Sequence, residues 1–250
     1  MAEAVLTETW GRVLLVTLNR PEAMNAINHD LAEGLLAAIQ RLDTDPDLSV
    51  GVLTGAGRGF SSGMDLKEFL SGNVPTRFLH FIEEGSPKPL VAAIEGFALA
   101  GGLELALGCD LLVAAKGAKL GLPEVRVGMF AAAGGLLRLP QRLPYSVAME
   151  MALTGEPITA EDALRYGLLA RLVEPGSALT DAMVLAERIA GGAPLAVATS
   201  KRLIRDSQSC TEAEFWALQQ ARMAIVFSSR DAAEGSRAFA EKRPAAWTGH

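Results

Sequence analysis

Two glycine-rich segments of the sequence have residue types suited to binding a polarised carbonyl oxygen. The first is GFSSGMDLKEF, beginning at Gly59, and the second is ALAGGLELA, beginning at Ala98. Each follows an expected strand and opens an expected helix, where main-chain N–H groups lack partners within the helix and carry partial positive charge. Two such N–H groups that converge form an oxyanion hole, which glycine lets the oxygen approach closely. Taken singly, each segment is equally compatible with an ordinary tight turn.

Two glutamates near these segments are candidates for proton transfer. Glu104 stands among leucines and alanines in the first turn of the second helix, and no Lys or Arg occurs between Glu95 and Ala115. Since apolar surroundings disfavour a charged carboxylate, its pKa should be raised, which suits acid–base chemistry. Glu124 follows a Gly-Leu-Pro turn. The simpler alternatives are a first-turn acid that compensates the helix dipole for Glu104 and a surface turn residue for Glu124.

Other catalytic motifs are incomplete. The segment Gly59–Gly63 matches the G-x-S-x-G nucleophile elbow, but the three histidines of the chain do not provide the order Ser, Asp or Glu, His. The segment Gly55–Phe60 fails the dinucleotide motif G-x-G-x-x-G, and no P-loop sequence occurs. Without H-E-x-x-H or a Cys/His cluster, we expect no metal held by the protein.

An alternation of short apolar strands and helices must position these residues. We expect strands at 5–10, 12–18, 50–54, 90–94 and 110–114, and helices at 28–42, from 101, and at 180–190, 195–205, 212–226 and 230–241. Beyond residue 135 the strand signals nearly vanish, and Thr211 with Glu214 forms a capping box. The pattern predicts an α/β core with a mostly parallel sheet over residues 1–190, followed by a helical region over 191–250.

Composition excludes several classes of protein. The 250 residues fit one core, and 23 basic against 29 acidic residues leave a net charge of −6, unlike the basic surface of a nucleic-acid-binding domain. No apolar stretch reaches the length of a membrane span, and the N-terminus does not resemble a secretory signal. Cys109 and Cys210 are expected to be buried, reduced thiols. We therefore expect a soluble, cytoplasmic protein without nucleic-acid or membrane partners.

Taken together, the motifs resemble those of the enoyl-CoA hydratase/isomerase (crotonase) family, in the family's order along most of the chain. Three departures concern the site: Ala100 replaces a third glycine, Glu95 replaces an asparagine, and the segment 127–133 replaces one that contains proline. The segment 134–140 is more similar to carnitinyl-CoA dehydratases. The matching segments are NRPEAMNA from Asn19, FSSGMDL from Phe60, AGGLELA from Ala100 with Cys109-Asp110, LPE ending at Glu124, Gly134-Gly135, Leu139-Pro140, ALRYGL from Ala163 and FAEKRP from Phe239.

The resemblance implies a spiral of repeated ββα units with a helical C-terminal trimerisation region, assembled as a homotrimer or a dimer of trimers. It implies a 2-enoyl-CoA substrate, with coenzyme A as part of that substrate and no separate cofactor. The N–H groups of Ser62 and Gly101 would hold the thioester oxygen. Glu124 would act as the principal acid/base and Glu104 would orient and activate water. The residues expected at the coenzyme A moiety are Ala23, Met24, Asn25, Ser62, Gly63, Met64, Asp65 and Gly101.

Three functions remain open at this point. The leading hypothesis is a hydro-lyase that reversibly adds water to a 2-enoyl-CoA, because one carboxylate can take a proton from water while a carboxylic acid supplies one to the α-carbon. An enoyl-CoA isomerase or a carnitinyl-CoA dehydratase on the same scaffold is the second. A non-catalytic acyl-CoA-binding protein is the third, and the presence of both glutamates argues against it.

Overall fold

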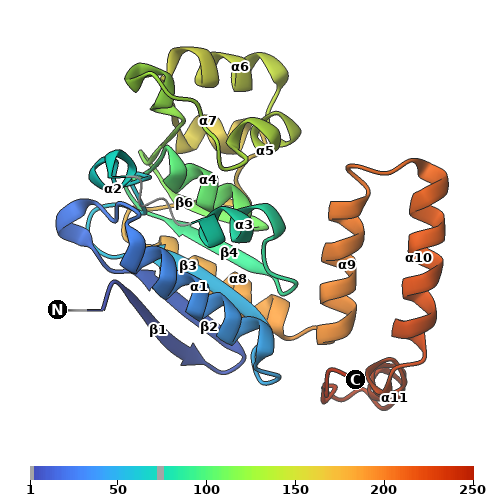
Figure 1. The fold of residues 1–250 in the computed structure, drawn as a ribbon. Helices are drawn as coiled ribbons and strands as arrows, with labels where there is room; N and C mark the ends of the chain where they lie inside the picture. The colour runs from blue at the N-terminus through green and yellow to red at the C-terminus, as the bar shows by residue number, and fades with distance from the viewer. Residues whose placement is uncertain (1–2, 72–75) are drawn as a thin grey trace.

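The main sheet forms the centre of the molecule in the computed structural model, which describes residues 3–71 and 76–250 (Figure 1). Its strand order is β1-β2-β3-β4-β6-β9, with β1 and β2 antiparallel and the other neighbouring strands parallel. A smaller sheet has the order β5-β7-β8. The strands are β1 Val5–Trp10, β2 Val13–Leu18, β3 Val50–Gly55, β4 Leu90–Ile94, β5 Phe97–Leu99, β6 Leu111–Ala115, β7 Lys119–Gly121, β8 Ile158–Thr159 and β9 Arg171–Val173.

Helices account for most of the remaining chain, and the expected ones are found within a few residues of their predicted ends. Asn28 caps α1 by accepting a hydrogen bond from the N–H of Leu31 (3.0 Å), and the capping box of Thr211 and Glu214 opens α10. The helices are α1 His29–Thr44, α2 Leu66–Leu70, α3 Thr76–Glu84, α4 Gly101–Gly108, α5 Gly135–Arg142, α6 Tyr145–Thr154, α7 Ala160–Arg165, α8 Ala178–Ala190, α9 Pro194–Asp206, α10 Glu212–Phe227 and α11 Arg230–Glu241, with 3-10 helices η1 Pro21–Ala23 and η2 Pro123–Val127.

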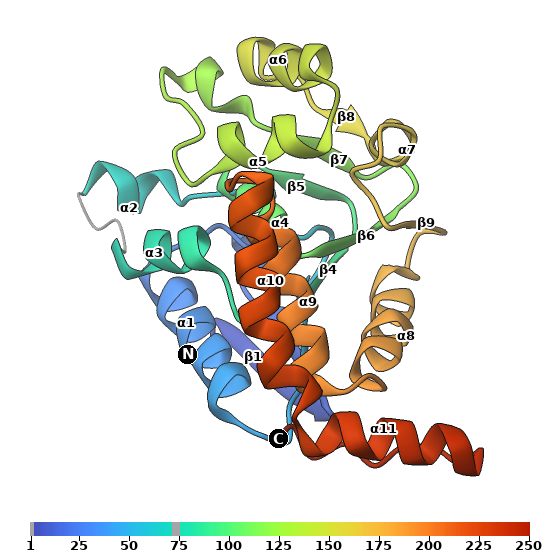
Figure 2. The same cartoon turned by 90° about the vertical axis from the view of Figure 1, so that its right-hand side faces the viewer.

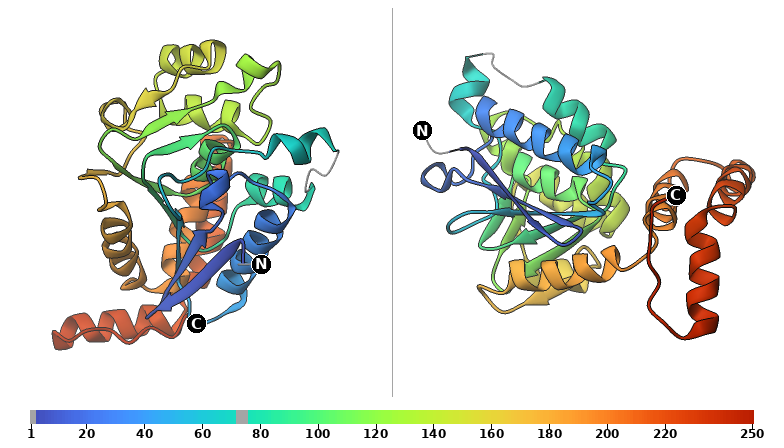
Figure 3. Two further views of the ribbon diagram at one scale, coloured as in Figure 1. Left: turned by 90° about the vertical axis from the view of Figure 1, so that its left-hand side faces the viewer. Right: turned by 90° about the horizontal axis from the view of Figure 1, so that it is seen from below.

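Both faces of the main sheet are covered. Side chains alternate along β2, so that Leu14 and Val16 join the core beneath α1, while Val13 and Leu15 join the alanines of α8 on the other face. Every residue of β4 is buried, as expected for a parallel strand covered on both sides. Figure 3 shows α1 and α8 on opposite sides of the sheet. The predicted α/β core is therefore confirmed.

The C-terminal helices extend beyond the sheet layers. Figure 2 shows α9 and α10 side by side, with α11 turned away from them. Lys201 of α9 connects this region to the core, since its Nζ lies 2.7 Å from Asp110 Oδ2 and 2.8 Å from the main-chain oxygen of Lys88. Apolar side chains are exposed along α10, and three of them, Trp216, Met223 and Phe227, are spaced so that they share one side of the helix. Its exposed apolar side chains include Trp216, Leu218, Met223, Ile225 and Phe227.

Three expectations about the chain need correction or comment. The sequence pattern missed β9, an edge strand that pairs with β6, because three half-buried residues carry too weak a strand signal. Cys109 is buried, and burial raises the pKa of its thiol to about 12, but Cys210 is only partly buried and the expectation for it was wrong. No single described helix is long and apolar enough to span a membrane; α8 and α9 meet that test only jointly and are bent by 109°.

Candidate active site

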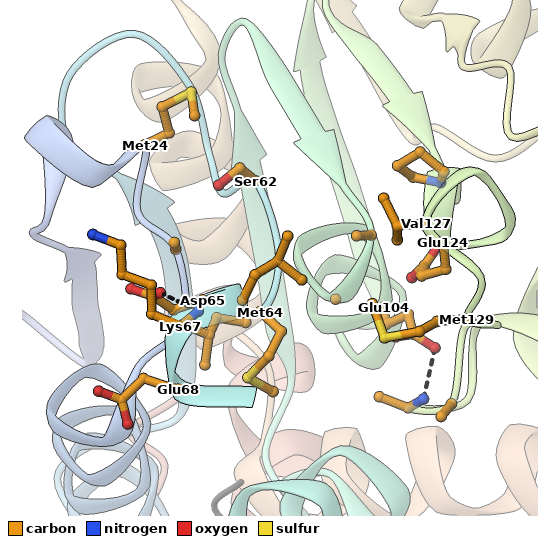
Figure 4. Close-up of a pocket in the computed structure, with 18 of the residues that line it drawn as sticks. Met24, Ser62, Met64, Asp65, Lys67, Glu68, Glu104, Glu124, Val127 and Met129 are labelled. Atoms are coloured by element: carbon orange, nitrogen blue, oxygen red, sulfur yellow. Dashed lines mark hydrogen bonds between the residues drawn. The ribbon is translucent and has the colours of Figure 1, made fainter. Parts of the chain in front are cut away.

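A cavity of about 1060 Å³ opens between the two glycine-rich segments and the chain around η2 (Figure 4). Met24 and Asp65 lie toward one end in Figure 4, and Glu104 and Glu124 lie toward the other. The apolar walls include Phe78 and Ile82 from α3, together with Val127, Met129 and Phe130 from η2 and the segment that follows it. The cavity thus contains polar groups from segments that are far apart in the sequence.

The main-chain N–H groups of Met64 and Gly101 are the two that meet at this cavity. A Cβ added to Gly63 would stand 2.9 Å from the nitrogen of Gly101, and a Cβ added to Gly101 would stand 3.5 Å from the nitrogen of Met64. Gly63 has φ of +100°, a conformation that favours glycine. Neither N–H has an acceptor in the part of the chain that the structure describes. Together they form a pair of free donors suited to an oxyanion.

The expectation that Ser62 supplies one of these donors was wrong. Its N–H donates to the main-chain oxygen of Met24 at 3.0 Å and is therefore occupied. Met24 has a left-handed conformation (φ 54°), and its segment lies alongside Ser62. Ser62 still lines the cavity, whereas the free donor belongs to Met64, two residues later. The one signal in the sequence that could have pointed to Met64 is that it directly follows Gly63, the glycine with positive φ.

Two other predicted residues shape the loop rather than line the cavity. Asn25 is fully buried; its side-chain amide donates to the oxygens of Ala56 (2.9 Å) and Gly59 (3.0 Å), and its Oδ1 accepts from the N–H of Arg20. Gly63 is buried against Gly101 and also does not line the cavity. Both therefore act through the loop that they hold, and the expectation of direct contact with the coenzyme A moiety is not met.

The serine of the G-x-S-x-G match has a structural role. Ser61 is fully buried; its hydroxyl donates to the oxygen of Asn25 (2.8 Å) and accepts from the N–H of Gly63 (3.1 Å). Both bonds hold the first glycine-rich loop in place. A hydroxyl that is buried and bonded in this way cannot attack a substrate, so the geometry supports the rejection of a serine hydrolase.

Glu104 is held by the segment that follows η2. Only 3% of the residue is exposed, and its Oε1 accepts hydrogen bonds from the N–H groups of Ala133 (2.7 Å) and Gly135 (2.9 Å). Burial raises the pKa of Glu104, as predicted, while these two bonds and the charge of Arg138 oppose the rise. The sequence missed this cation because Arg138 comes from α5. The carboxylate is thus fixed in orientation, with Oε2 making no hydrogen bond to the described residues.

Glu124 lies in the first turn of η2, which Pro123 opens, and its side chain lines the same cavity. Its Oε2 is buried without a hydrogen-bond partner among the described residues. Burial raises the pKa of Glu124 to about 7, and the nearby charge of Glu104 adds to the rise. A carboxyl with that pKa can donate or accept a proton near neutral pH. The structure therefore brings both predicted glutamates to one cavity, with different surroundings.

The opposite end of the cavity holds the remaining predicted residues. Ala23, Met24 and Asp65 line it. The Oδ2 of Asp65 lies 3.3 Å from Nη1 of Arg20, which also donates to the oxygen of Ala26 at 2.6 Å. This pairing fixes the wall of the cavity. No group of three or more His, Cys, Asp or Glu side chains within the described residues is arranged to hold a metal ion.

Comparisons with known proteins show the family of the chain. The family model for enoyl-CoA hydratase/isomerase matches residues 8–250. The chain is 40% identical to enoyl-CoA hydratase EchA19 of Mycobacterium tuberculosis over 95% of this chain and 94% of that protein. It is 41% identical to (E)-benzylidenesuccinyl-CoA hydratase of Thauera aromatica, over 98% and 99% of the two chains. It is 38% identical to carnitinyl-CoA dehydratase of Proteus mirabilis over the full length of both.

The fold is also found among solved structures. A crystal structure of enoyl-CoA hydratase from Mycobacterium tuberculosis superposes with a TM-score of 0.97 at 49% identity, over all of both chains. The predicted crotonase-like α/β fold with its helical C-terminal region is therefore confirmed. Because the family model matches nearly the whole chain, the chain belongs to the enoyl-CoA hydratase/isomerase family.

Proposed function

We propose that this protein catalyses the reversible syn addition of water to a 2-enoyl-CoA thioester. The observation that carries the proposal is the cavity in which two free N–H groups, of Met64 and Gly101, accompany two carboxyl groups with raised pKa values. The N–H groups would stabilise charge on the thioester oxygen, and the carboxyl groups would move protons. This reaction uses each of the four groups.

The oxyanion hole would stabilise the enolate. When the oxygen of water attacks the β-carbon, the electron pair of the double bond moves through the α-carbon to the thioester oxygen. Met64 and Gly101 would donate to that oxygen, and loss of one donor of this kind costs about 3–4 kcal/mol of transition-state stabilisation. No cofactor is needed for this step, because the substrate carries its own activating thioester.

The two glutamates would divide the proton transfers. Burial raises the pKa of Glu104 and makes it a stronger base, while its two main-chain hydrogen bonds favour the charged form, so it would take the proton of the attacking water. Glu124, with a pKa of about 7 and an unpartnered oxygen, would deliver a proton to the α-carbon as the enolate collapses. In dehydration the same groups exchange roles. Since the two carboxyl groups influence each other, the titration belongs to the pair.

Carnitinyl-CoA dehydratase is the second candidate. The relative of that name is 38% identical over the full chain, and a dehydratase removes water from a CoA thioester, the reverse of hydration. The same donors and carboxyl groups would serve it. An isomerase requires a single well-placed base, so the pairing of Glu104 with Glu124 favours hydration over isomerisation. Comparing kcat/KM for 2-enoyl-CoA substrates with that for carnitinyl-CoA distinguishes these two candidates.

We also propose that the protein assembles as a homotrimer or a dimer of trimers. The apolar side of α10 supports this, since Trp216, Met223 and Phe227, which share that side, are 56%, 43% and 73% exposed in the single chain. Exposed apolar surface of this kind marks a protein interface. Sedimentation equilibrium would measure the mass of the assembly.

The experiment that tests the proposed reaction follows the loss of crotonyl-CoA absorbance. The wild type should hydrate crotonyl-CoA or a longer or branched 2-enoyl-CoA from the same panel. Glu124→Gln and Glu104→Gln should each lower kcat by about 10²–10⁴-fold while acyl-CoA still binds. Binding without turnover of any substrate would favour the non-catalytic alternative. Migration of the double bond without addition of water would favour the isomerase.

A further inference from the structure

Arg138 lies directly behind the turn that holds Glu104. Its N–H donates to the oxygen of Gly134 at 3.0 Å, and the next residue, Gly135, donates to Glu104. The guanidinium folds back over this turn, since a Cβ added to Gly134 would stand 2.7 Å from Nη1 of Arg138. A Cβ added to Gly135 would stand 3.0 Å from Oε1 of Glu104. Two successive glycines thus give room to the cation and to the carboxylate.

The other arm of the guanidinium reaches α3. Its Nη2 donates to the main-chain oxygens of Ile82 and Glu83 (3.3 Å for Glu83), in the last turn of that helix. Carbonyl groups at a helix C-terminus lack partners within the helix and carry partial negative charge, so a guanidinium is a suitable partner. Because α3 contributes Phe78 and Ile82 to the cavity, this contact connects a cavity wall to the turn that binds Glu104.

Arg138 is the cation whose charge acts on Glu104, and other ionisable groups surround it. The groups that face it are Arg142 on the same helix, Arg205 on α9, the Cys109 thiol and Glu104. Its Nη1 is buried with no hydrogen-bond partner among the described residues. Arginine retains its charge in such surroundings. The charge of Arg138 acts on Glu104, and the charge of Glu104 acts in turn on Glu124 of η2.

We propose that Arg138 is a positioning residue for the reaction: its guanidinium ties the end of α3 to the turn that binds Glu104 and supplies the cation that this carboxylate faces. The inference rests on the proposed function, in which Glu104 must be ionised to take a proton from water. It concerns no direct contact with substrate, since Arg138 does not line the cavity.

The test measures the pH dependence of kcat/KM for crotonyl-CoA, or for the best 2-enoyl-CoA of the panel. Arg138→Gln can still donate to α3 but has no charge, so the pKa of Glu104 should rise. The acid limb of the profile, where kcat/KM falls as Glu104 is protonated, should therefore move up by about one pH unit. Arg138→Lys keeps the charge but not the two-armed contact. It should retain the wild-type acid limb and raise KM several-fold. Arg142→Gln, one turn further along α5, is the matched control and should leave the limb unchanged.

A purely structural role would lower thermal stability in both variants without moving the acid limb. That result in folded Arg138→Gln protein would overturn the inference. If Arg138→Gln does not fold, Arg138→Lys decides: an acid limb displaced by half a unit or more, or an unchanged KM, would contradict it. A wild type that hydrates no substrate of the panel would refute the proposed function and the inference with it. An active wild type with an unmoved limb in Arg138→Gln refutes the inference alone.

Discussion

A lysine in place of Val127 should lower the pKa of Glu124 and weaken it as an acid. Both residues belong to η2 and line the cavity, and Figure 4 shows Val127 beside Glu124. Residues three apart stack on the same side of a 3-10 helix. Val127 is 59% exposed, so a lysine there can place its ammonium group near the cavity without being buried. The matched control is Val127→Gln, which is similarly long, polar and uncharged.

The size of the effect follows from the position of Glu124. A carboxyl group with a pKa of about 7 is half protonated at pH 7, whereas one with a pKa of 4.5 would be about 0.3% protonated. A cation about 6 Å away in a partly solvated site, with an effective dielectric of roughly 40–80, contributes about 0.7–1.4 kcal/mol. This corresponds to a pKa lowered by about 0.5–1 unit. At pH 7 the protonated share would then fall to roughly 10–25%.

The assay is the pH profile of kcat/KM for hydration of a 2-enoyl-CoA. In the wild type, activity should decline above about pH 7 as Glu124 loses its proton. In Val127→Lys the alkaline limb should begin 0.5–1 pH unit lower, which reduces kcat/KM about 2–5-fold at pH 7 relative to Val127→Gln. The two variants should converge below about pH 5.5. Identical alkaline limbs in the two variants would refute the assignment of Glu124 as the acid.

Three further outcomes follow from the loops around the cavity. Asn25→Ala should destabilise the fold by about 2–3 kcal/mol, because it leaves the main-chain oxygens of Ala56 and Gly59, half-buried and buried, without their partner. A denaturant titration would measure this, and an unchanged midpoint would contradict it. Gly63→Ala should lower kcat about 100-fold, since its Cβ would stand 2.7 Å from that of Ala100 and displace the oxyanion hole. The control Gly108→Ala, whose Cβ would meet no atom within 4 Å, should behave as wild type in the same assay. A fluorophosphonate probe should not label buried Ser61, as mass spectrometry would detect. Labelling of Ser61 would contradict its structural role and support a serine nucleophile.

The sequence by itself determined the elements and the main chemical groups. Periodic apolar residues predicted β1 to β4, α1 and the four helices from α8 to α11, because local pattern and capping residues suffice for such elements. The glycine-rich segments predicted where free N–H groups would occur. Glu104 was identifiable from its apolar neighbours, whereas the role of Glu124 came from the resemblance to the family, because its local sequence also fits an ordinary turn.

Only the tertiary structure decided which groups share the cavity and how each is partnered. The N–H of Ser62 donates to the oxygen of Met24, which lies 38 residues earlier, so the free donor at the cavity is the N–H of Met64. Asn25 is a buried tie between loops rather than a cavity residue. Glu104 acquires its two donors and its cation from a segment about 30 residues later. The physical reason is that hydrogen bonding and desolvation depend on distances between segments, which no local pattern of residues encodes.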